Sequence, residues 1–95
     1  MIVLQIEHPV PNFERWKKAF ESDPIDRKKS GVKSYRIYRL AKDPGYVIID
    51  LVFDNVTAAE STLVALRKLW VNVQGVVMEN AKTRILEIVE AKESL

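Results

Sequence analysis

The chain has 95 residues, of which 47% are hydrophobic and 29% are charged, a composition typical of one globular domain spanning residues 1–95. Its formal net charge of +2 is too balanced to indicate a nucleic-acid or membrane partner. The absence of cysteine excludes disulfides, thiolate metal sites and a cysteine nucleophile, and the single histidine excludes any site that needs two from one chain.

The N-terminal segment 1–7 predicts a β-strand that Pro9 and Pro11 end, because its aliphatic and polar side chains alternate. The segment has no basic start and no cleavage site of small residues, so it does not resemble a signal peptide. No apolar run approaches the roughly 18–20 residues of a membrane span. We therefore expect a cytoplasmic protein without a membrane segment.

A helix is expected next, with Asn12 as the N-cap, because its side-chain oxygen can accept a hydrogen bond from a backbone N–H of the first turn. Phe13, Trp16 and Phe20 then recur at helical spacing and predict one buried face. Asp23-Pro24 ends this helix. The same pair can start a second short helix, in which Asp23 is the N-cap and Gly31 the stop.

A β-hairpin is predicted in the middle of the chain. Residues 32–40 and 46–53 favour β-structure, and the segment 41–45 contains Pro44 and Gly45, which favour a turn. The expected loop is about five residues long.

A second helix is expected after this hairpin. Thr57 and Glu60 fit a capping box, and apolar residues recur at helical spacing to about Val71. The segment 72–81 is ambiguous, with Gly75 as the expected breaker, and a last strand is expected at 82–90.

The predicted order is therefore βαββαβ, an α+β ferredoxin-like fold in which two helices cover one face of a four-stranded antiparallel sheet. The helix-covered face is expected to hold Ile2, Leu4, Ile6, Tyr35, Ile37, Val47, Ile49, Leu51, Phe53, Ile85, Glu87 and Val89. The open face is expected to hold Val3, Gln5, Glu7, Ser34, Arg36, Tyr38, Ile48, Asp50, Val52, Arg84, Leu86 and Ile88.

The open face is too apolar for a surface that faces only water, because five of these twelve residues are aliphatic. Covering each large aliphatic side chain fully contributes about 2 kcal/mol. The chain has no spare element to cover them. We therefore expect a homodimer in which the open faces of two copies pack together.

Several segments resemble the dimeric α+β barrel superfamily, which includes the antibiotic-biosynthesis-monooxygenase-like domains. The similar segments are the first helix at 13–20, the second strand at 31–39, the hairpin at 43–47 and the strand end at 53–54. The resemblance implies a homodimer whose two sheets face each other as a barrel. It does not fix an activity, because the family includes cofactor-independent monooxygenases, haem-degrading enzymes and domains of unknown activity.

Polar side chains on the open face form the candidate site. The expected hairpin register places Arg36 beside Asp50. In a site, Arg36 would hold an anionic or carbonyl group, and Tyr38 would donate a proton. Asp50 or Glu7 would act as a base. The residues expected to surround them as ligand-binding groups are Gln5, Glu7 and Arg84. The alternative is an inert structural ion pair between Arg36 and Asp50 at the dimer interface.

Two further residues are interpreted as structural. His8 is expected to be an exposed histidine at a strand end, although it is the residue best suited to switch charge near neutral pH. No histidine stands in the second half of the chain, where the haem-degrading branch of the family would place one, so haem degradation is disfavoured. Trp70 is interpreted as a core or interface residue. The segment 76–78 is considered for the mouth of a cavity.

Nucleic-acid binding is the weakest of the functional hypotheses. The basic residues Arg27, Lys28, Lys29 and Lys33 cluster, but they are interpreted as a solvated helix face. Gly45-Tyr46 resembles the start of an RNA-binding strand, but Ile48 stands where a second stacking aromatic is needed. No metal site or cofactor is expected.

The sequence thus predicts a homodimeric barrel with a small-molecule cavity between sheet and helices. It does not choose between an enzyme and a non-enzymatic ligand-binding, regulatory or structural domain.

Overall fold

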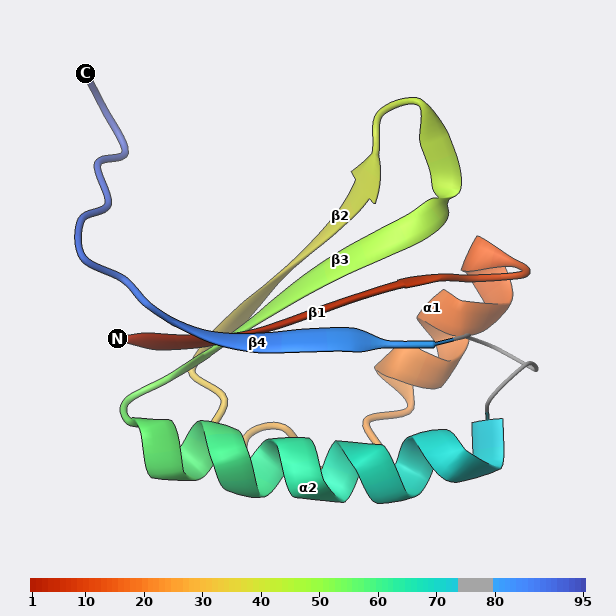
Figure 1. Cartoon of the computed structure of the whole chain (residues 1–95), viewed down its shortest axis with the longest axis horizontal. Helices are drawn as coiled ribbons and strands as arrows, with labels where there is room; N and C mark the ends of the chain where they lie inside the picture. Colours follow the sequence, from red (N-terminus) through yellow and green to blue (C-terminus); the bar gives the residue numbers. More distant parts are fainter. Residues whose placement is uncertain (74–79) are drawn as a thin grey trace.

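The computed structural model describes residues 1–73 and 80–95, and these form the predicted βαββαβ arrangement (Figure 1). The elements are β1 (Ile2–Pro9), α1 (Phe13–Glu21), β2 (Ser34–Leu40), β3 (Asp43–Phe53), α2 (Val56–Val73) and β4 (Lys82–Glu87). The strands form one antiparallel sheet in the order β2-β3-β1-β4. Both helices lie on one face of the sheet, and neither covers the other face (Figure 1). The ferredoxin-like fold is therefore confirmed.

The first helix begins where the sequence places it. The Asn12 side chain accepts a hydrogen bond of 2.9 Å from the backbone N–H of Arg15, and its extended backbone is that of an N-cap. Trp16 is buried, and the rings of Phe13 and Phe20 lie 5.8 Å and 5.5 Å from it. The helical spacing of these aromatic residues thus places three neighbouring, mutually tilted rings beneath the sheet.

The second short helix predicted after Asp23 is wrong, because residues 22–33 form turns. Asp23 and Asp26 have φ of +53° and +51°, in the left-handed region, whereas an N-cap residue has extended backbone. Gly31 has φ of +97°, so glycine is needed here to end a turn rather than a helix.

The hairpin is tighter than predicted. β3 begins at Asp43, so only Ala41 and Lys42 lie between the strands, and a register shift follows Arg39. Gly45 belongs to β3, and its carbonyl oxygen accepts a bond of 2.7 Å from the backbone N–H of Val10. The segment 43–45 therefore continues the strand instead of forming the turn, because Gly45 pairs with Val10, which directly follows β1.

The second helix starts two residues earlier than the predicted capping box. The Asn55 side chain accepts a hydrogen bond of 2.9 Å from the backbone N–H of Ala58, which makes Asn55 the N-cap and places Thr57 inside the helix. The expected breaker Gly75 and the segment 76–78 lie outside the described residues.

The core lies between the sheet and the helices, as the alternation of side chains predicts. Its fully buried residues include Leu4, Val47 and Phe53. Tyr35 belongs to this face, since its ring meets the Phe20 ring edge-on at 5.1 Å. The assignment of Val89 to this face is wrong, because β4 ends at Glu87 and Val89 is 88% exposed.

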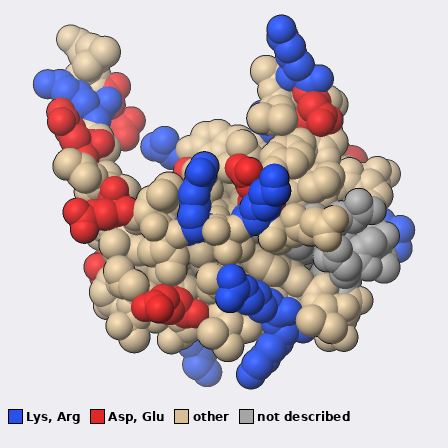
Figure 2. Space-filling view, viewed as in Figure 1, with Lys and Arg blue, Asp and Glu red and all other residues tan. Residues whose placement is uncertain are grey.

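Charges of both signs are interspersed over the face drawn in Figure 2. No helix within the described ranges is long and apolar enough to cross a membrane.

Candidate functional site

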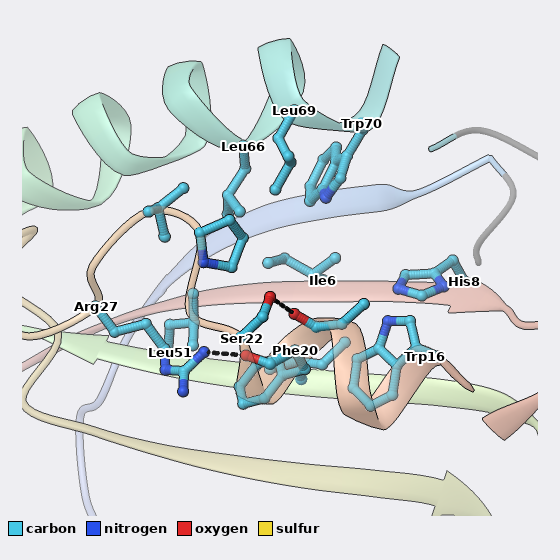
Figure 3. A pocket seen from close by; sticks show the side chains of 14 residues that line it. Ile6, His8, Trp16, Phe20, Ser22, Arg27, Leu51, Leu66, Leu69 and Trp70 are labelled. Carbon is cyan, nitrogen blue, oxygen red and sulfur yellow. Dashed lines mark hydrogen bonds between the residues drawn. The ribbon is translucent and has the colours of Figure 1, made fainter. Parts of the chain in front are cut away.

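A cavity of about 220 Å³ lies between the sheet and the two helices (Figure 3). β1 and β3 contribute one wall, α1 and the turn after it contribute the second, and α2 contributes the third. Most of its lining is aliphatic or aromatic. The lining residues are Ile6, His8, Trp16, Ala19, Phe20, Ser22, Pro24, Ile25, Arg27, Ile49, Leu51, Leu66, Leu69 and Trp70.

The geometry of the cavity suits a flat apolar molecule. Trp16 and Phe20 extend from α1, and Trp70 extends from α2 toward them (Figure 3). Leu66 and Leu69 supply aliphatic surface beside Trp70. Aromatic rings attract other rings in offset or edge-to-face arrangements, which such a lining provides. The interpretation of Trp70 as a residue that contacts the core is confirmed.

His8 is the buried polar group of this cavity. Only 2% of His8 is exposed, so the expectation of an exposed histidine is wrong. It follows Ile6 on the helix-facing side of β1, and its cross-strand partner is the fully buried Val47. The imidazole ring meets the Trp16 ring edge-on at 5.9 Å. The alternation that assigns Ile6 to the core also assigns His8 there, and this signal was missed.

The surroundings of His8 define its protonation state. Its Nδ1 lies 3.0 Å from the carbonyl oxygen of Pro9, which can only accept a hydrogen bond, so we assign the proton of the neutral ring to Nδ1. Burial lowers the pKa of His8 below the ordinary value of 6.5, and the Pro9 contact opposes this only in part. His8 is therefore neutral at pH 7, with a lone pair on Nε2.

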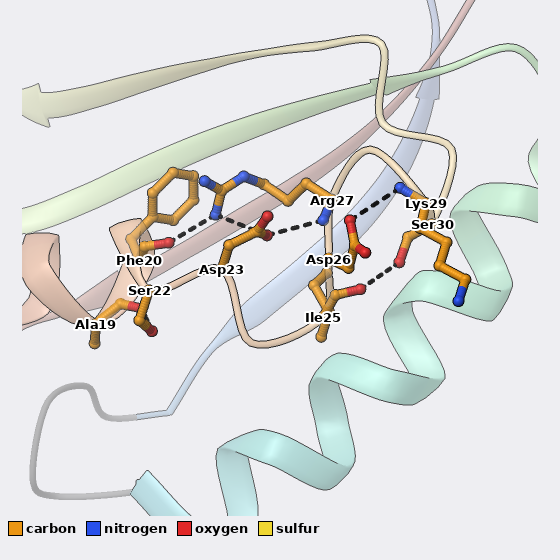
Figure 4. Close-up of polar contacts among 9 residues, drawn as sticks. All are labelled: Ala19, Phe20, Ser22, Asp23, Ile25, Asp26, Arg27, Lys29 and Ser30. Atoms are coloured by element: carbon orange, nitrogen blue, oxygen red, sulfur yellow. Dashed lines mark hydrogen bonds and ion pairs between the residues drawn. The ribbon is translucent and has the colours of Figure 1, made fainter.

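Arg27 is the charged residue among the described residues that line the cavity. Its guanidinium group lies 4.1 Å from the centre of the Phe20 ring and 5.2 Å from that of Tyr35. Its Nη1 donates to the carbonyl oxygen of Phe20 at 2.7 Å and lies 3.5 Å from the Asp23 carboxylate (Figure 4). The interpretation of Arg27 as part of a solvated helix face is wrong, because its side chain is only 17% exposed.

The turn that carries Arg27 is held by its own side chains (Figure 4). The Asp23 carboxylate also accepts the backbone N–H of Arg27 at 2.8 Å, and Asp26 accepts that of Lys29 at 3.2 Å. The Ser30 hydroxyl donates to the carbonyl oxygen of Ile25 at 2.7 Å. These side-chain hydrogen bonds pair with backbone groups that a helix would otherwise pair, and they hold Arg27 at the wall of the cavity.

On the open face, four of the predicted site residues form a hydrogen-bonded row across all four strands. Arg84 donates to Gln5 at 2.7 Å, and Gln5 donates to Asp50 at 2.9 Å. Tyr38 donates to the other oxygen of Asp50 at 3.1 Å. The register explains this row, since Gln5 pairs with both Asp50 and Arg84. The structure therefore brings these four residues together.

The two remaining candidates lie apart from this row. Arg36 is directly opposite Asp50, as predicted, but its guanidinium group lies 3.7 Å from the carboxylate of Glu93. Among the described residues, no ion pair joins Arg36 to Asp50. Glu7 interacts with Tyr46, whose pKa is raised by burial and then by the nearby Glu7 carboxylate.

None of the six residues predicted for the site lines the cavity, because all six lie on the opposite face of the sheet. The described part of the chain contains no group of three acidic, histidine or cysteine side chains that could hold a metal ion. The cavity can therefore bind an apolar molecule and offer it a few polar contacts. The row on the open face is a satisfied network that suits an interface.

No protein-family model matches the chain, and no curated protein matches it in sequence. Solved structures do match. A variant of SnoaB, a cofactor-independent oxygenase from Streptomyces nogalater, has a TM-score of 0.77 at 7% identity over 98% of this chain and 97% of that chain. An antibiotic biosynthesis monooxygenase has a TM-score of 0.65 at 12% identity over 95% of this chain and 100% of that chain.

A dimeric ferredoxin-like protein from an uncultured marine organism has a TM-score of 0.67 at 12% identity over 96% of this chain and 97% of that chain. The chain thus has the fold of the antibiotic-biosynthesis-monooxygenase-like proteins, and the resemblance drawn from the sequence is confirmed at the level of fold. At identities this low, structural similarity shows a shared fold and does not show a shared function.

Proposed function

We propose that this protein is a homodimeric α+β barrel that binds a small, mainly apolar ring compound in the cavity between its sheet and helices. The observation that carries the proposal is the cavity itself, which is lined by aromatic and aliphatic side chains and contains few polar groups. Pockets that bind small molecules have this composition, in which apolar walls provide affinity and a few polar groups fix orientation.

The volume limits the size of the ligand. A dry apolar cavity of about 150 Å³ binds benzene, whereas pockets for drug-sized ligands begin at about 300 Å³. At about 220 Å³ this cavity lies between the two. A ligand of one or two fused rings therefore fits its dimensions.

The open face supports the homodimer. Leu86 and Ile88 are each 38% exposed there, and Ile48 and Val52 are half-buried. A second copy would cover these side chains and enclose the polar row, whose members already satisfy one another. The marine neighbour, which is a dimeric ferredoxin-like protein, supports this arrangement.

The ligand test compares two variants that add the same side chain to α1 and α2. Ala19 lines the cavity, so Ala19→Leu should fill part of it, whereas Ala65 is exposed and Ala65→Leu should leave it open. Benzofuran is a suitable probe, because it has two fused rings and no hydrogen-bond donor. Its binding is measured by ligand-observed NMR and by the shift of the thermal unfolding midpoint.

Benzofuran should bind the wild-type protein and Ala65→Leu alike, and Ala19→Leu should weaken binding at least about tenfold, or about 1.4 kcal/mol. Circular dichroism confirms that each variant is folded. Equal binding of benzofuran to both variants would contradict the proposed function.

A further inference from the structure

We infer that His8 is the recognition point of the cavity, where its Nε2 accepts a hydrogen bond from an O–H or N–H group of the bound ring compound. This inference rests on the proposed function and adds the chemical class of the ligand: a neutral, flat molecule with one hydrogen-bond donor.

His8 lies at the end of β1 that lines the cavity, with the Trp16 ring edge-on against it and Trp70 across from it (Figure 3). Nδ1 is directed to the carbonyl oxygen of Pro9 on its own strand. Nε2 is on the opposite edge of the ring, so a molecule between the aromatic side chains can approach it.

With its proton on Nδ1, the neutral His8 ring can only accept at Nε2, so it selects a donor. A histidine enclosed by apolar side chains favours such a donor strongly, because a ligand without one leaves the buried nitrogen unpaired. The same site discriminates against ligands whose only polar group is an acceptor.

His8 is placed to accept a hydrogen bond and not to carry a full positive charge. The Nδ1 partner is a neutral backbone carbonyl, whereas catalytic histidines that become imidazolium are usually supported by a carboxylate. Among residues 1–73 and 80–95, those that line the cavity include no Asp or Glu, and their one charged side chain, Arg27, is cationic. Of the described residues near His8, Ile6 on β1, Val47 on β3, Trp16 on α1 and Trp70 on α2 are all uncharged.

The experiment uses two probes of the same shape. Indole and benzofuran differ mainly in that indole donates a hydrogen bond and benzofuran cannot. One hydrogen bond to a buried acceptor corresponds to a preference of about tenfold, so indole should bind the wild-type protein about tenfold more tightly at pH 7.5. In His8→Phe, which keeps a ring at this position, the two affinities should become equal.

A second measurement does not depend on any variant. The chain has one histidine, so ¹⁵N–¹H long-range NMR reports His8 alone. The spectrum at pH 7.5 should show Nδ1 protonated and Nε2 unprotonated, and indole should shift the Nε2 signal far more than that of Nδ1. Lowering the pH until Nε2 is protonated should abolish the preference for indole, because Nε2 then has no lone pair to accept the indole N–H.

The outcomes separate the two proposals. If both probes bind equally well, or if the proton lies on Nε2 at pH 7.5, the role of His8 is wrong and the proposed function stands. If neither probe binds the folded wild-type protein, both are overturned. A preference for indole that survives in His8→Phe would also overturn the role of His8.

Discussion

At the scale of single residues, the burial of His8 couples the stability of the protein to pH. Burial lowers the pKa of His8 in the folded state below 6.5, whereas an unfolded chain titrates near that value. As the pH falls below 6.5, the unfolded state therefore binds a proton that the folded state does not yet bind. The free energy of unfolding must decrease in this range, and above it His8 contributes no pH dependence.

We therefore expect the wild-type protein to lose stability between pH 7.5 and pH 5 more steeply than His8→Phe, which lacks this titration. The difference should arise mainly below pH 6.5. Urea unfolding of both proteins at each pH measures it. Parallel curves for the two proteins would show that His8 has the same pKa in the folded and unfolded states.

Alternation in the sequence predicts on which face of a strand a residue lies. It does not predict the role of that residue in a site. Alternation along β1 assigns Ile6 to the core, and the same count assigns His8. The role proposed for His8 could not be read from this pattern. The tautomer of His8 depends on its contact with the Pro9 carbonyl, and its burial depends on α1, which supplies Trp16. The burial is a consequence of tertiary structure, which alternation along one strand does not show.

At the scale of elements, the helix starts show how local signals compete. Asn55 and Thr57 are both good N-cap residues, and Thr57 also has a glutamate three positions later. Asn55 is nevertheless the cap, because the strand before it ends at Phe53 and the helix begins at Val56. The length of the connection decides between two caps that the sequence makes nearly equal.

This competition can be measured. Asn55→Ala should lower the free energy of unfolding by about 1 kcal/mol, because it removes the acceptor for the backbone N–H of Ala58. Thr57→Ala, in an exposed position of the first turn, should change it by less than about 0.5 kcal/mol. Chemical denaturation provides both values. If Thr57→Ala costs more than Asn55→Ala, the cap assignment is wrong.

The turn after α1 was less predictable than the helices. Asp23-Pro24 is compatible with a helix start, but here Asp23 adopts positive φ and its carboxylate binds Arg27. That geometry depends on Phe20, whose ring and carbonyl oxygen hold the guanidinium group. Local propensity therefore predicts a break in the helix and cannot predict which side chains close the turn.

At the scale of the whole molecule, the two faces of the sheet have different roles in this account. The helix-covered face encloses the cavity, and the open face carries the polar row and the exposed aliphatic side chains. The sequence predicted both faces and the cavity between sheet and helices. It assigned the candidate site to the open face, because the polar residues with possible catalytic or binding roles are there. The residues that line the cavity are mostly apolar, and in a sequence they have the same pattern as ordinary core residues.

The proposed homodimer rests on the exposed aliphatic side chains of the open face. Ile48→Glu should raise the dimer dissociation constant at least about a hundredfold, because it removes about 2 kcal/mol of apolar burial and places a carboxylate in the interface. Val64→Glu, on the exposed side of α2, is the matched control and should leave the dimer intact. Sedimentation equilibrium measures both. A wild-type monomer at micromolar concentration, or a dimeric Ile48→Glu, would contradict this arrangement.

The most direct test of the proposed ligand site between the sheet and the helices is a benzofuran titration of protein labelled at its Ile, Leu and Val methyl groups. We expect the methyl signals of Ile6, Leu66 and Leu69, which line the cavity, to shift together and saturate. Signals of Ile48 and Leu86, on the open face, should remain in place. Shifts confined to Ile48 and Leu86 would place the ligand on the open face of the sheet and overturn the proposed site.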